Sequence, residues 1–339
     1  MERGRLVTVF GGSGFLGRHL IQRFAQAGAR IRVVSRSPDH AIHLQPLGDA
    51  GQIALMRGSL GDPEVIARAV AGDDVVINLA GILYESRFYE SLYGPGGQTF
   101  QAVHVDGARR LAEAAAEAGA LRFIHVSAIG AAADSPAHYG RSKAAGEAAV
   151  RRAFPDATIL RPSILFGPED DFFNRFAALS QFTPVLPLIG GDPFDERMFG
   201  GYMFKGHRFG GGTTRFQPVY AGDVAEAILR CAEDPATKGR TYELGGPRQY
   251  SFRDLLEFIL GEIGRHRLLL PVWFWAASLK GWFLGFLPTP PLTADQVAML
   301  KRDNVVAEGA LGLSDLGIEP TAVEAVVPSY LARFRSGGK

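Results

Sequence analysis

Three polar residues near the middle of the chain have types and a spacing that suit proton transfer: Ser127, Tyr139 and Lys143. Tyr139 and Lys143 are four residues apart, so in a helix they lie on one face. A neighbouring ammonium, aided by the ribose of a nicotinamide cofactor, stabilises a phenolate, and we expect it to lower the pKa of Tyr139 from its ordinary value of about 10. Such a tyrosine can pass a proton to or from a substrate oxygen that Ser127 holds, while a hydride moves at the adjacent carbon. The alternative is an ordinary solvated helix pair, so the interpretation depends on the elements that position these residues.

The first of those elements is a glycine-rich turn close to the N-terminus. The apolar run Leu6–Phe10 leads directly into Gly11-Gly12-Ser13-Gly14-Phe15-Leu16-Gly17. A helical pattern of apolar residues follows, and Gly28 closes it. Glycines let the backbone approach phosphates closely, and a helix N-terminus offers free N–H groups and the positive end of a dipole. A turn without a ligand is the alternative, but the strand–turn–helix context favours a dinucleotide site formed by these seven residues.

The end of the second expected strand, Ile31–Arg36, indicates which dinucleotide binds. A NAD site usually carries Asp or Glu there, about 20 residues past the glycine turn, to bind the ribose 2′-hydroxyl. This chain has Ser35 and Arg36, with Arg32 nearby and Asp39 slightly further on. An arginine pairs with a 2′-phosphate, so NADP(H) is favoured and NAD(H) stays possible; a solvated loop charge is the alternative for Arg36.

Two further strand ends are expected to contact the cofactor. Ser59 and Asp62 follow the third apolar run and are expected near the adenine edge. The fourth run leads to Asn78, Ala80 and Gly81, which are expected beneath the cofactor. Ser127, Tyr139 and Lys143 complete this set, since the Lys143 ammonium is also expected to bind the nicotinamide ribose.

The alternation of apolar runs and amphipathic segments predicts an α/β protein with a doubly wound, parallel, Rossmann-type sheet. Strands are expected near residues 6–10, 31–35, 53–56, 75–79, 122–127 and 157–161. Helices are expected near residues 15–27, 63–71, 105–118 and 140–153. The predicted domains are a NAD(P)-binding domain over 1–166, to which 216–246 return, and a smaller, mostly helical cap over 167–215 and 247–339.

Composition excludes several classes of protein. The 339 residues are 47% hydrophobic and carry 36 basic against 35 acidic side chains, without a basic block, so nucleic acid is not an expected partner. Eight scattered histidines and the single Cys231 give no zinc pattern and no internal disulfide, which suits a reducing compartment. Because the first strand begins almost at Met1, no signal peptide is expected and the protein is placed in the cytoplasm.

Two segments lack an ordinary pattern. The stretch Leu268–Leu287 contains all three tryptophans and has the length of a membrane span, but Pro271, Lys280 and two glycines interrupt it. As a helix it would form one apolar stripe, which is either part of the cap core or, as we favour, a surface for lipid headgroups or a partner subunit: Val272, Trp275, Leu279, Trp282 and Phe286.

The second segment, Gly190–Thr214, mixes glycine, phenylalanine and charged residues without periodicity. It is expected to be a mobile lid, a docking loop or disordered.

The glycine turn and the Ser–Tyr–Lys set resemble those of the extended short-chain dehydrogenase/reductases. The resemblance implies that Gly11, Gly14 and Gly17 bind the phosphates and that Ser127, Tyr139 and Lys143 form the active triad. One departure is the helix that often begins with Asn-Val in that family, which here reads His104-Val105.

A narrower resemblance lies further along the chain. The runs Phe166-Gly-Pro-Glu-Asp-Asp-Phe-Phe-Asn174, Gln217-Pro-Val-Tyr220 and Asp315-Leu-Gly-Ile318 are similar to the alpha-subcomplex subunit 9 family of respiratory complex I. This resemblance implies an NADP(H)-binding accessory protein with complex I subunits as partners, peripheral on the inner face of the plasma membrane and without assigned turnover. The intact triad favours the alternative of a soluble NAD(P)-dependent oxidoreductase or epimerase, and a redox-sensing or assembly protein outside a stable complex is a third class.

Overall fold

The computed structural model describes residues 4–72, 74–85, 98–190, 211–284 and 292–335. Its central sheet has seven parallel strands in the order β11-β6-β5-β4-β1-β2-β3. The strands are β1 (Leu6–Phe10), β2 (Arg30–Ser35), β3 (Ile53–Arg57), β4 (Val75–Asn78), β5 (Arg122–Val126), β6 (Thr158–Pro162) and β11 (Thr241–Leu244). This order is the doubly wound arrangement, so the predicted fold class is confirmed.

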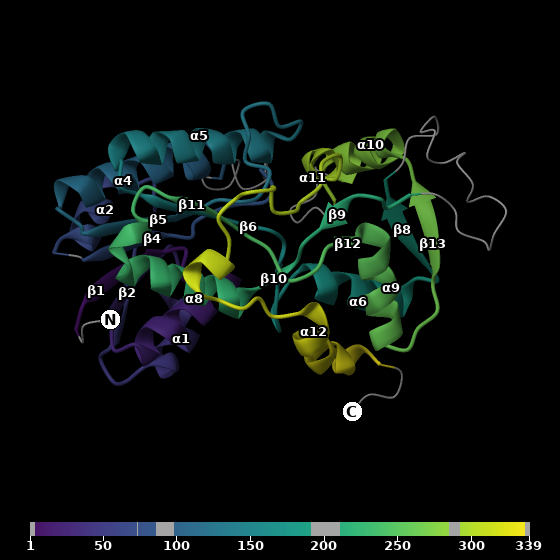
Figure 1. The fold of residues 1–339 in the computed structure, drawn as a ribbon, viewed down its shortest axis with the longest axis horizontal. Helices are drawn as coiled ribbons and strands as arrows, with labels where there is room; N and C mark the ends of the chain where they lie inside the picture. Colours follow the sequence, from purple (N-terminus) through teal and green to yellow (C-terminus); the bar gives the residue numbers. More distant parts are fainter. Residues whose placement is uncertain (1–3, 73, 86–97, 191–210, 285–291, 336–339) are drawn as a thin grey trace.

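Helices cover both faces of the sheet (Figure 1). One face carries α1 (Phe15–Gln26) and α8 (Ala221–Glu233), and the other carries α2 (Pro63–Val70), α4 (Ala108–Glu117) and α5 (His138–Ala153). Because both faces are covered, the inner strands are mostly apolar and buried along their length; all four residues of β4 and all five of β5 are buried. Short 3₁₀ helices lie at Pro38–Leu47, Pro235–Thr237, Ser314–Leu316 and Ala332–Phe334.

The helix expected near 105–118 begins earlier than predicted. The wider turns of a π-helix span Gln101–Gly107 and continue into α4. Sequence periodicity does not distinguish π from α turns, and π turns often occur at functional sites. His104 lies inside this segment.

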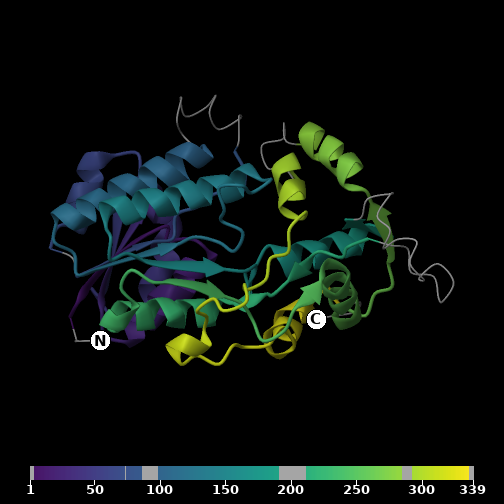
Figure 2. The ribbon, with the colours of Figure 1, turned by 45° about the horizontal axis from the view of Figure 1, so that its top comes forward.

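The cap lies beside the sheet domain along the long axis of the molecule (Figures 1 and 2). It has its own apolar core, in which Phe173, Leu256 and Val327 are fully buried. Its helices are α6 (Phe172–Phe182), α9 (Phe252–Glu262), α10 (Phe274–Leu284), α11 (Ala294–Met299) and α12 (Val323–Leu331). Three two-stranded sheets pair β10 (Val219–Tyr220) with β7 (Leu165–Phe166), β12 (Tyr250–Ser251) with β9 (Arg215–Phe216), and β13 (Leu268–Val272) with β8 (Val185–Ile189).

Part of the C-terminal region returns to the sheet domain. Leu313, Leu316 and Ile318 pack into the core formed by α1 and α8, and the Leu311 carbonyl accepts a hydrogen bond from Glu243 N at 2.8 Å. The structure therefore differs from the predicted boundary, which assigned all of 247–339 to the cap.

The Phe-Gly-Pro-Glu-Asp run connects the two domains. Glu169 forms an ion pair with Arg18 at 3.1 Å, and its carboxylate also lies 3.7 Å from His19 Nε2; both residues are on α1. The Asp170 carboxylate accepts hydrogen bonds from the Phe173 N–H at the start of α6, at 2.6 Å, and from the Tyr330 hydroxyl on α12. The unusual residues of this run thus hold the cap against the first helix of the sheet domain.

The prediction of one helix over Leu268–Leu287 is wrong for its first part. Leu268–Val272 forms strand β13, since a continuous apolar run suits a strand as well as a helix. Helix α10 follows, and residues 285–287 lie outside the described part of the chain, as do 191–210 of the irregular glycine- and phenylalanine-containing segment. No helix in the described part is long and apolar enough to cross a bilayer.

Candidate dinucleotide and active site

The glycine turn between β1 and α1 forms an open cradle. Gly11 has φ +81°, and a Cβ there would lie 2.8 Å from the Ala80 backbone nitrogen. A Cβ at Gly17 would overlap the Gly12 carbonyl, so this glycine lets α1 pack closely against the turn. At Gly14, by contrast, the nearest atom to an added Cβ is Gly11 O at 3.4 Å.

The start of α1 is not capped by a side chain. Gly14 is its N-cap residue, and the first turn contains no acidic residue. Helix N-terminal N–H groups without side-chain acceptors are a binding position for an anion. Together with the open space at Gly14, this end of the helix fits the diphosphate of a nicotinamide dinucleotide, and Gly12, Ser13, Phe15 and Leu16 lie on the same turn.

The residues expected at the ribose lie beside this turn. The Ser35 and Ser13 hydroxyl oxygens are 3.5 Å apart, and Arg36 is exposed directly after β2. Asp39 forms an ion pair with Arg57 at 3.7 Å, which offsets its charge. The Arg32 side chain donates hydrogen bonds to the Ala69 carbonyl and to Thr8 Oγ1, so these bonds hold it within the sheet domain.

The structure gives supporting contacts to three of the other expected cofactor residues. Asp62 caps α2 by accepting a hydrogen bond from the Val65 N–H at 3.1 Å, and Ser59 Oγ accepts one from the Gly61 N–H at 3.1 Å. Asn78 is fully buried, and its Oδ1 accepts a hydrogen bond from the Ala80 N–H at 3.0 Å. Asn78 therefore shapes the loop that carries Ala80 and Gly81.

Tyr139 and Lys143 contact each other on α5, and Lys143 reaches the backbone next to Ser127. Ser127 directly follows β5, and its Oγ is buried without a hydrogen-bond partner. Tyr139 and Lys143 lie on the first turns of α5, with the Lys143 ammonium 5.9 Å from the centre of the Tyr139 ring. Lys143 also donates a hydrogen bond to the Val126 carbonyl at 3.3 Å. A buried hydroxyl without a partner is unusual, and a bound ligand oxygen would satisfy it.

The pKa values of this set differ from the expectation. Burial raises the pKa of Tyr139 to about 12 and lowers the pKa of Lys143 to about 8, although Glu147 opposes the second shift. In the protein alone the Tyr139 pKa is thus raised, because burial disfavours the phenolate; the predicted lowering involves the nicotinamide ribose as well as the ammonium. Tyr139 is a neutral phenol at neutral pH, which can donate a proton.

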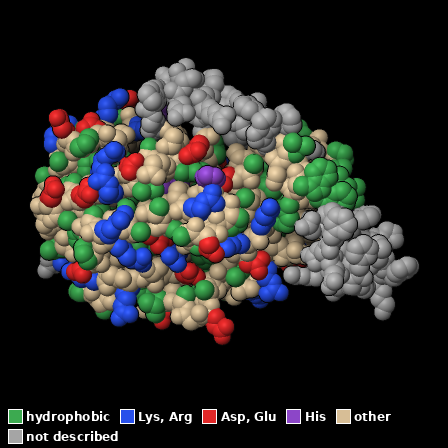
Figure 3. Space-filling model, turned by 90° about the horizontal axis from the view of Figure 1, so that it is seen from above, with side chains coloured by type: hydrophobic (Ala, Val, Ile, Leu, Met, Phe, Trp, Pro, Cys, Tyr) green, Lys and Arg blue, Asp and Glu red, His purple; other side chains and the backbone are tan. Residues whose placement is uncertain are grey.

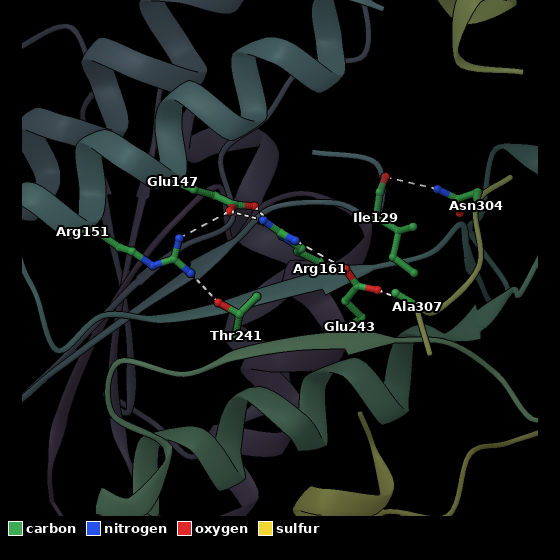
Figure 4. Close-up of polar contacts among 8 residues, drawn as sticks. All are labelled: Ile129, Glu147, Arg151, Arg161, Thr241, Glu243, Asn304 and Ala307. Atoms are coloured by element: carbon green, nitrogen blue, oxygen red, sulfur yellow. Dashed lines mark hydrogen bonds and ion pairs between the residues drawn. The ribbon is translucent and has the colours of Figure 1, made fainter. Parts of the chain in front are cut away.

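A buried ion-pair network fixes α5 on the sheet (Figure 4). Glu147 accepts two hydrogen bonds from Arg161 on β6, at 2.9 and 2.7 Å. Arg161 also donates to Glu243 on β11 at 3.4 Å, and Glu243 accepts a hydrogen bond from the Ala307 N–H at 2.9 Å. Arg151 lies 3.8 Å from Glu147 and bonds the Thr241 hydroxyl. The network holds the helix that carries Tyr139 and Lys143 and connects it to the C-terminal segment.

A carboxylate from the cap closes the N-terminus of α5. Asp295, on α11, accepts hydrogen bonds from the His138 N–H at 2.6 Å and the Tyr139 N–H at 2.9 Å. A carboxylate there satisfies free N–H groups and interacts favourably with the helix dipole. Sequence reasoning missed Asp295, because it lies 156 positions beyond Tyr139 and no local pattern connects the two.

Asn304 covers the carboxyl ends of β5 and β6. Its Oδ1 accepts hydrogen bonds from the Ser163 hydroxyl at 2.6 Å and the Ile164 N–H at 3.2 Å, and its Nδ2 donates to the Ile129 carbonyl at 3.3 Å. Figure 4 shows the contact between Asn304 and Ile129, two positions after Ser127. Polar groups at this edge, where ligands of such sheets bind, are thus satisfied by the chain's own C-terminal segment. Sequence reasoning missed Asn304 as well.

The described residues contain no group of His, Cys, Asp or Glu side chains that could hold a metal ion. The open cradle at Gly14 and the partnerless Ser127 hydroxyl instead fit a dinucleotide and its reacting end.

Comparisons with known proteins show the family to which the chain belongs. The family model for the NAD dependent epimerase/dehydratase family matches residues 7–245. The mitochondrial NADH dehydrogenase (ubiquinone) 1 alpha subcomplex subunit 9 of Arabidopsis thaliana is 35% identical, over 99% of this chain and 79% of that protein. A ceramide reductase of Caulobacter vibrioides is 40% identical over 54% of each chain.

Among solved structures, a dTDP-glucose 4,6-dehydratase of Streptomyces venezuelae with bound NAD shares the fold. Its TM-score is 0.66 at 19% identity, over 97% of this chain and 96% of that chain. The sequence match to the Arabidopsis subunit extends through the cap and the C-terminal segment, beyond the region that the family model covers. The chain therefore belongs to the NAD dependent epimerase/dehydratase family and, within it, to the alpha subcomplex subunit 9 group of NADH dehydrogenase proteins.

Proposed function

We propose that this protein is an NADP(H)-binding accessory subunit of a respiratory NADH:quinone oxidoreductase, peripheral on the inner face of the plasma membrane. The observation that carries the proposal is the contrast between the two ends of the site. The phosphate cradle at Gly14 is open, whereas the polar groups that follow β5 and β6 are already hydrogen-bonded to Asn304. Such a site can retain a dinucleotide, while the polar groups bonded to Asn304 are not free to bind a second ligand.

The preference for NADP(H) over NAD(H) rests on Arg36. Arg36 is exposed and directly follows Ser35, whose hydroxyl lies 3.5 Å from that of Ser13, and Asp39 three positions on is paired with Arg57. A charge-assisted hydrogen bond from Arg36 to a 2′-phosphate would favour NADP(H). In calorimetric titrations, Arg36→Ala is expected to lose most of this preference while NAD(H) affinity changes little. Equal affinities of the unmodified protein for the two dinucleotides would contradict the assignment.

The membrane or subunit contact is assigned to β13 and α10. Large apolar side chains are exposed on this part of the cap: Leu268, Leu270, Trp273, Trp275 and Leu279. Trp275 is 59% exposed and Leu279 is 53% exposed, which supports a surface role for the predicted stripe at these two positions rather than burial in the cap core. Figure 3 shows hydrophobic side chains gathered at the cap end of the molecule. Exposed patches of this kind are typical of partner surfaces, and tryptophan suits a boundary between water and an apolar phase.

A second candidate function is reduction of a carbonyl substrate. It is favoured by the intact Ser127, Tyr139 and Lys143 and by the 40% identity to the Caulobacter ceramide reductase over half of the chain. In that case the neutral Tyr139 phenol would donate the proton to the reduced oxygen, and Ser127 would hold that oxygen. The dinucleotide would supply the hydride.

Complementation of a deletion strain distinguishes the two functions. Tyr139→Phe removes one hydroxyl, so an accessory subunit should keep its NADPH occupancy and restore membrane NADH oxidation fully. Failure to rescue despite normal NADPH occupancy would overturn the accessory role and support the reductase. Lys143→Ala is expected to weaken NADPH binding itself, because its ammonium is the group expected to bind the nicotinamide ribose.

A further inference from the structure

His104 is buried next to the nicotinamide end of the proposed cofactor site. The residue is 2% exposed and lies in the π-helical turn Gln101–Gly107. Its Nε2 lies 3.0 Å from the Ile82 backbone nitrogen, and its Nδ1 lies 2.8 Å from Ser142 Oγ. Both ring nitrogens therefore have partners, one on the loop after β4 and one on α5.

These partners determine where the proton of the ring resides. A backbone N–H can only donate, so the Ile82 N–H makes Nε2 an acceptor and places the proton on Nδ1. Nδ1 then donates to Ser142 Oγ, and the Ser142 hydroxyl donates to the Tyr139 carbonyl at 2.8 Å. The result is a directed chain of hydrogen bonds from the loop after β4, through the imidazole, to the first turn of α5.

The surroundings of the ring keep it neutral and in place. Burial and the charge of Lys143 on α5 lower the pKa of His104 to about 3, with His125 on β5 acting in the same direction. The ring stacks on Phe100 at 5.3 Å between centres and meets the Tyr139 ring edge-on at 5.5 Å.

The loop, the imidazole and the ammonium converge at Gly81. A Cβ at Gly81 would lie 3.2 Å from Lys143 Nζ and 3.6 Å from His104 Nε2. A shift of the imidazole would therefore move both the loop below the proposed nicotinamide position and the Lys143 and Tyr139 side chains.

We infer that His104 is a positioning residue for the nicotinamide half of the site, which holds the loop Leu79–Ile82 and the first turn of α5 at a fixed separation. This inference rests on the proposed dinucleotide binding. It assigns His104 no contact with the adenine half, which lies at the other strand ends around Ser35 and Ser59.

Two amide variants remove the two hydrogen bonds of His104 separately. In His104→Asn the amide reaches the position of Nδ1 and can still bond Ser142, but it is too short to reach Ile82. In His104→Gln the amide oxygen reaches the position of Nε2 and can still accept from Ile82, but the bond to Ser142 is lost. Each variant is expected to weaken NADPH binding about five- to tenfold, the effect of one buried hydrogen bond. Binding of 2′,5′-ADP, which lacks the nicotinamide half, should change less than twofold.

Ser142→Ala supplies an independent test at a smaller change in the core. Alone it should weaken NADPH binding at least as much as His104→Gln, since both remove the bond between the imidazole and Ser142 and only Ser142→Ala also removes the bond to the Tyr139 carbonyl. Added to His104→Gln it should have a smaller effect than when it is added to His104→Asn, which keeps the bond to Ser142. His266→Gln, at an exposed histidine of the cap, is the matched control and should bind both ligands as the parent does.

The inference is overturned if the His104 and Ser142 variants lose NADPH and 2′,5′-ADP affinity equally, which would indicate a general loss of structure. It is also overturned if neither affinity changes. Failure of the parent protein to bind either ligand would instead refute the proposed dinucleotide function, so the two failures are distinguishable.

Discussion

Replacing Lys143 by methionine is expected to make the nucleotide-free protein more stable at pH 7. The Lys143 side chain is 5% exposed, and burial lowers its pKa from 10.5 to about 8. One pKa unit corresponds to 1.36 kcal/mol, so burying the charged form costs about 3 kcal/mol of folding free energy below pH 8. Methionine has a similar length and no charge. It loses the hydrogen bond to the Val126 carbonyl, worth about 1 kcal/mol, which leaves a net gain of about 2 kcal/mol.

The pH dependence of the free energy of unfolding shows in which direction the Lys143 charge acts. Between about pH 8 and 10.5 the unfolded chain holds the Lys143 proton and the folded protein does not, so the stability of the parent rises with pH in this window. The advantage of Lys143→Met should therefore be largest at pH 7 and disappear near pH 10. Urea unfolding followed by circular dichroism at both pH values measures this difference.

Lys238→Met is the matched control, because Lys238 is half-exposed in a surface ion pair with Asp156 at 3.5 Å. It should change stability by less than about 0.5 kcal/mol. A Lys143→Met protein that is less stable than the parent at pH 7, or that differs from it equally at both pH values, would refute the reasoning. NADPH binding by Lys143→Met is expected to be strongly reduced at both pH values. The substitution should therefore raise the stability of the nucleotide-free protein at pH 7 and lower its affinity for NADPH.

Three further substitutions test the geometry. Gly17→Ala should abolish dinucleotide binding and lower the melting temperature, because the added Cβ overlaps the Gly12 carbonyl; normal NADPH titration would show that α1 can shift. Asp295→Ala should destabilise the protein by about 1 kcal/mol and speed hydrogen exchange at the Tyr139 amide, and unchanged exchange would argue against the cap contact. Asn304→Ala should expose the strand ends, so that acrylamide quenches bound NADPH fluorescence more strongly than in the parent; equal quenching would contradict the covered site.

The sheet domain could be predicted because its signals are local. Strands buried on both faces give short apolar runs, and the glycine turn between Leu6–Phe10 and α1 marks the first crossover. The observed strands begin and end within one or two residues of the predicted ones, Ser127 directly follows β5, and Tyr139 and Lys143 lie on α5 as expected.

The cap and the closure of the site could not be predicted in the same way. Leu268–Val272 is apolar throughout, and its pairing with β8 depends on a strand more than 80 positions earlier. Asp295 and Asn304 act on α5 and on the strand ends only after the C-terminal segment has folded back. The raised pKa of Tyr139 in the protein alone could not be predicted for a similar reason, since burial depends on packing that the Tyr-x-x-x-Lys spacing does not encode.

The central claim is that the protein is an accessory subunit of the respiratory NADH:quinone oxidoreductase. The most direct test is mass spectrometry of complexes separated by native electrophoresis after mild solubilisation of host membranes. We expect the protein to migrate with the core subunits of the oxidoreductase, and deletion of its gene to lower the amount of the assembled complex. Migration at the size of the free chain, with the oxidoreductase fully assembled in the deletion strain, would contradict the claim.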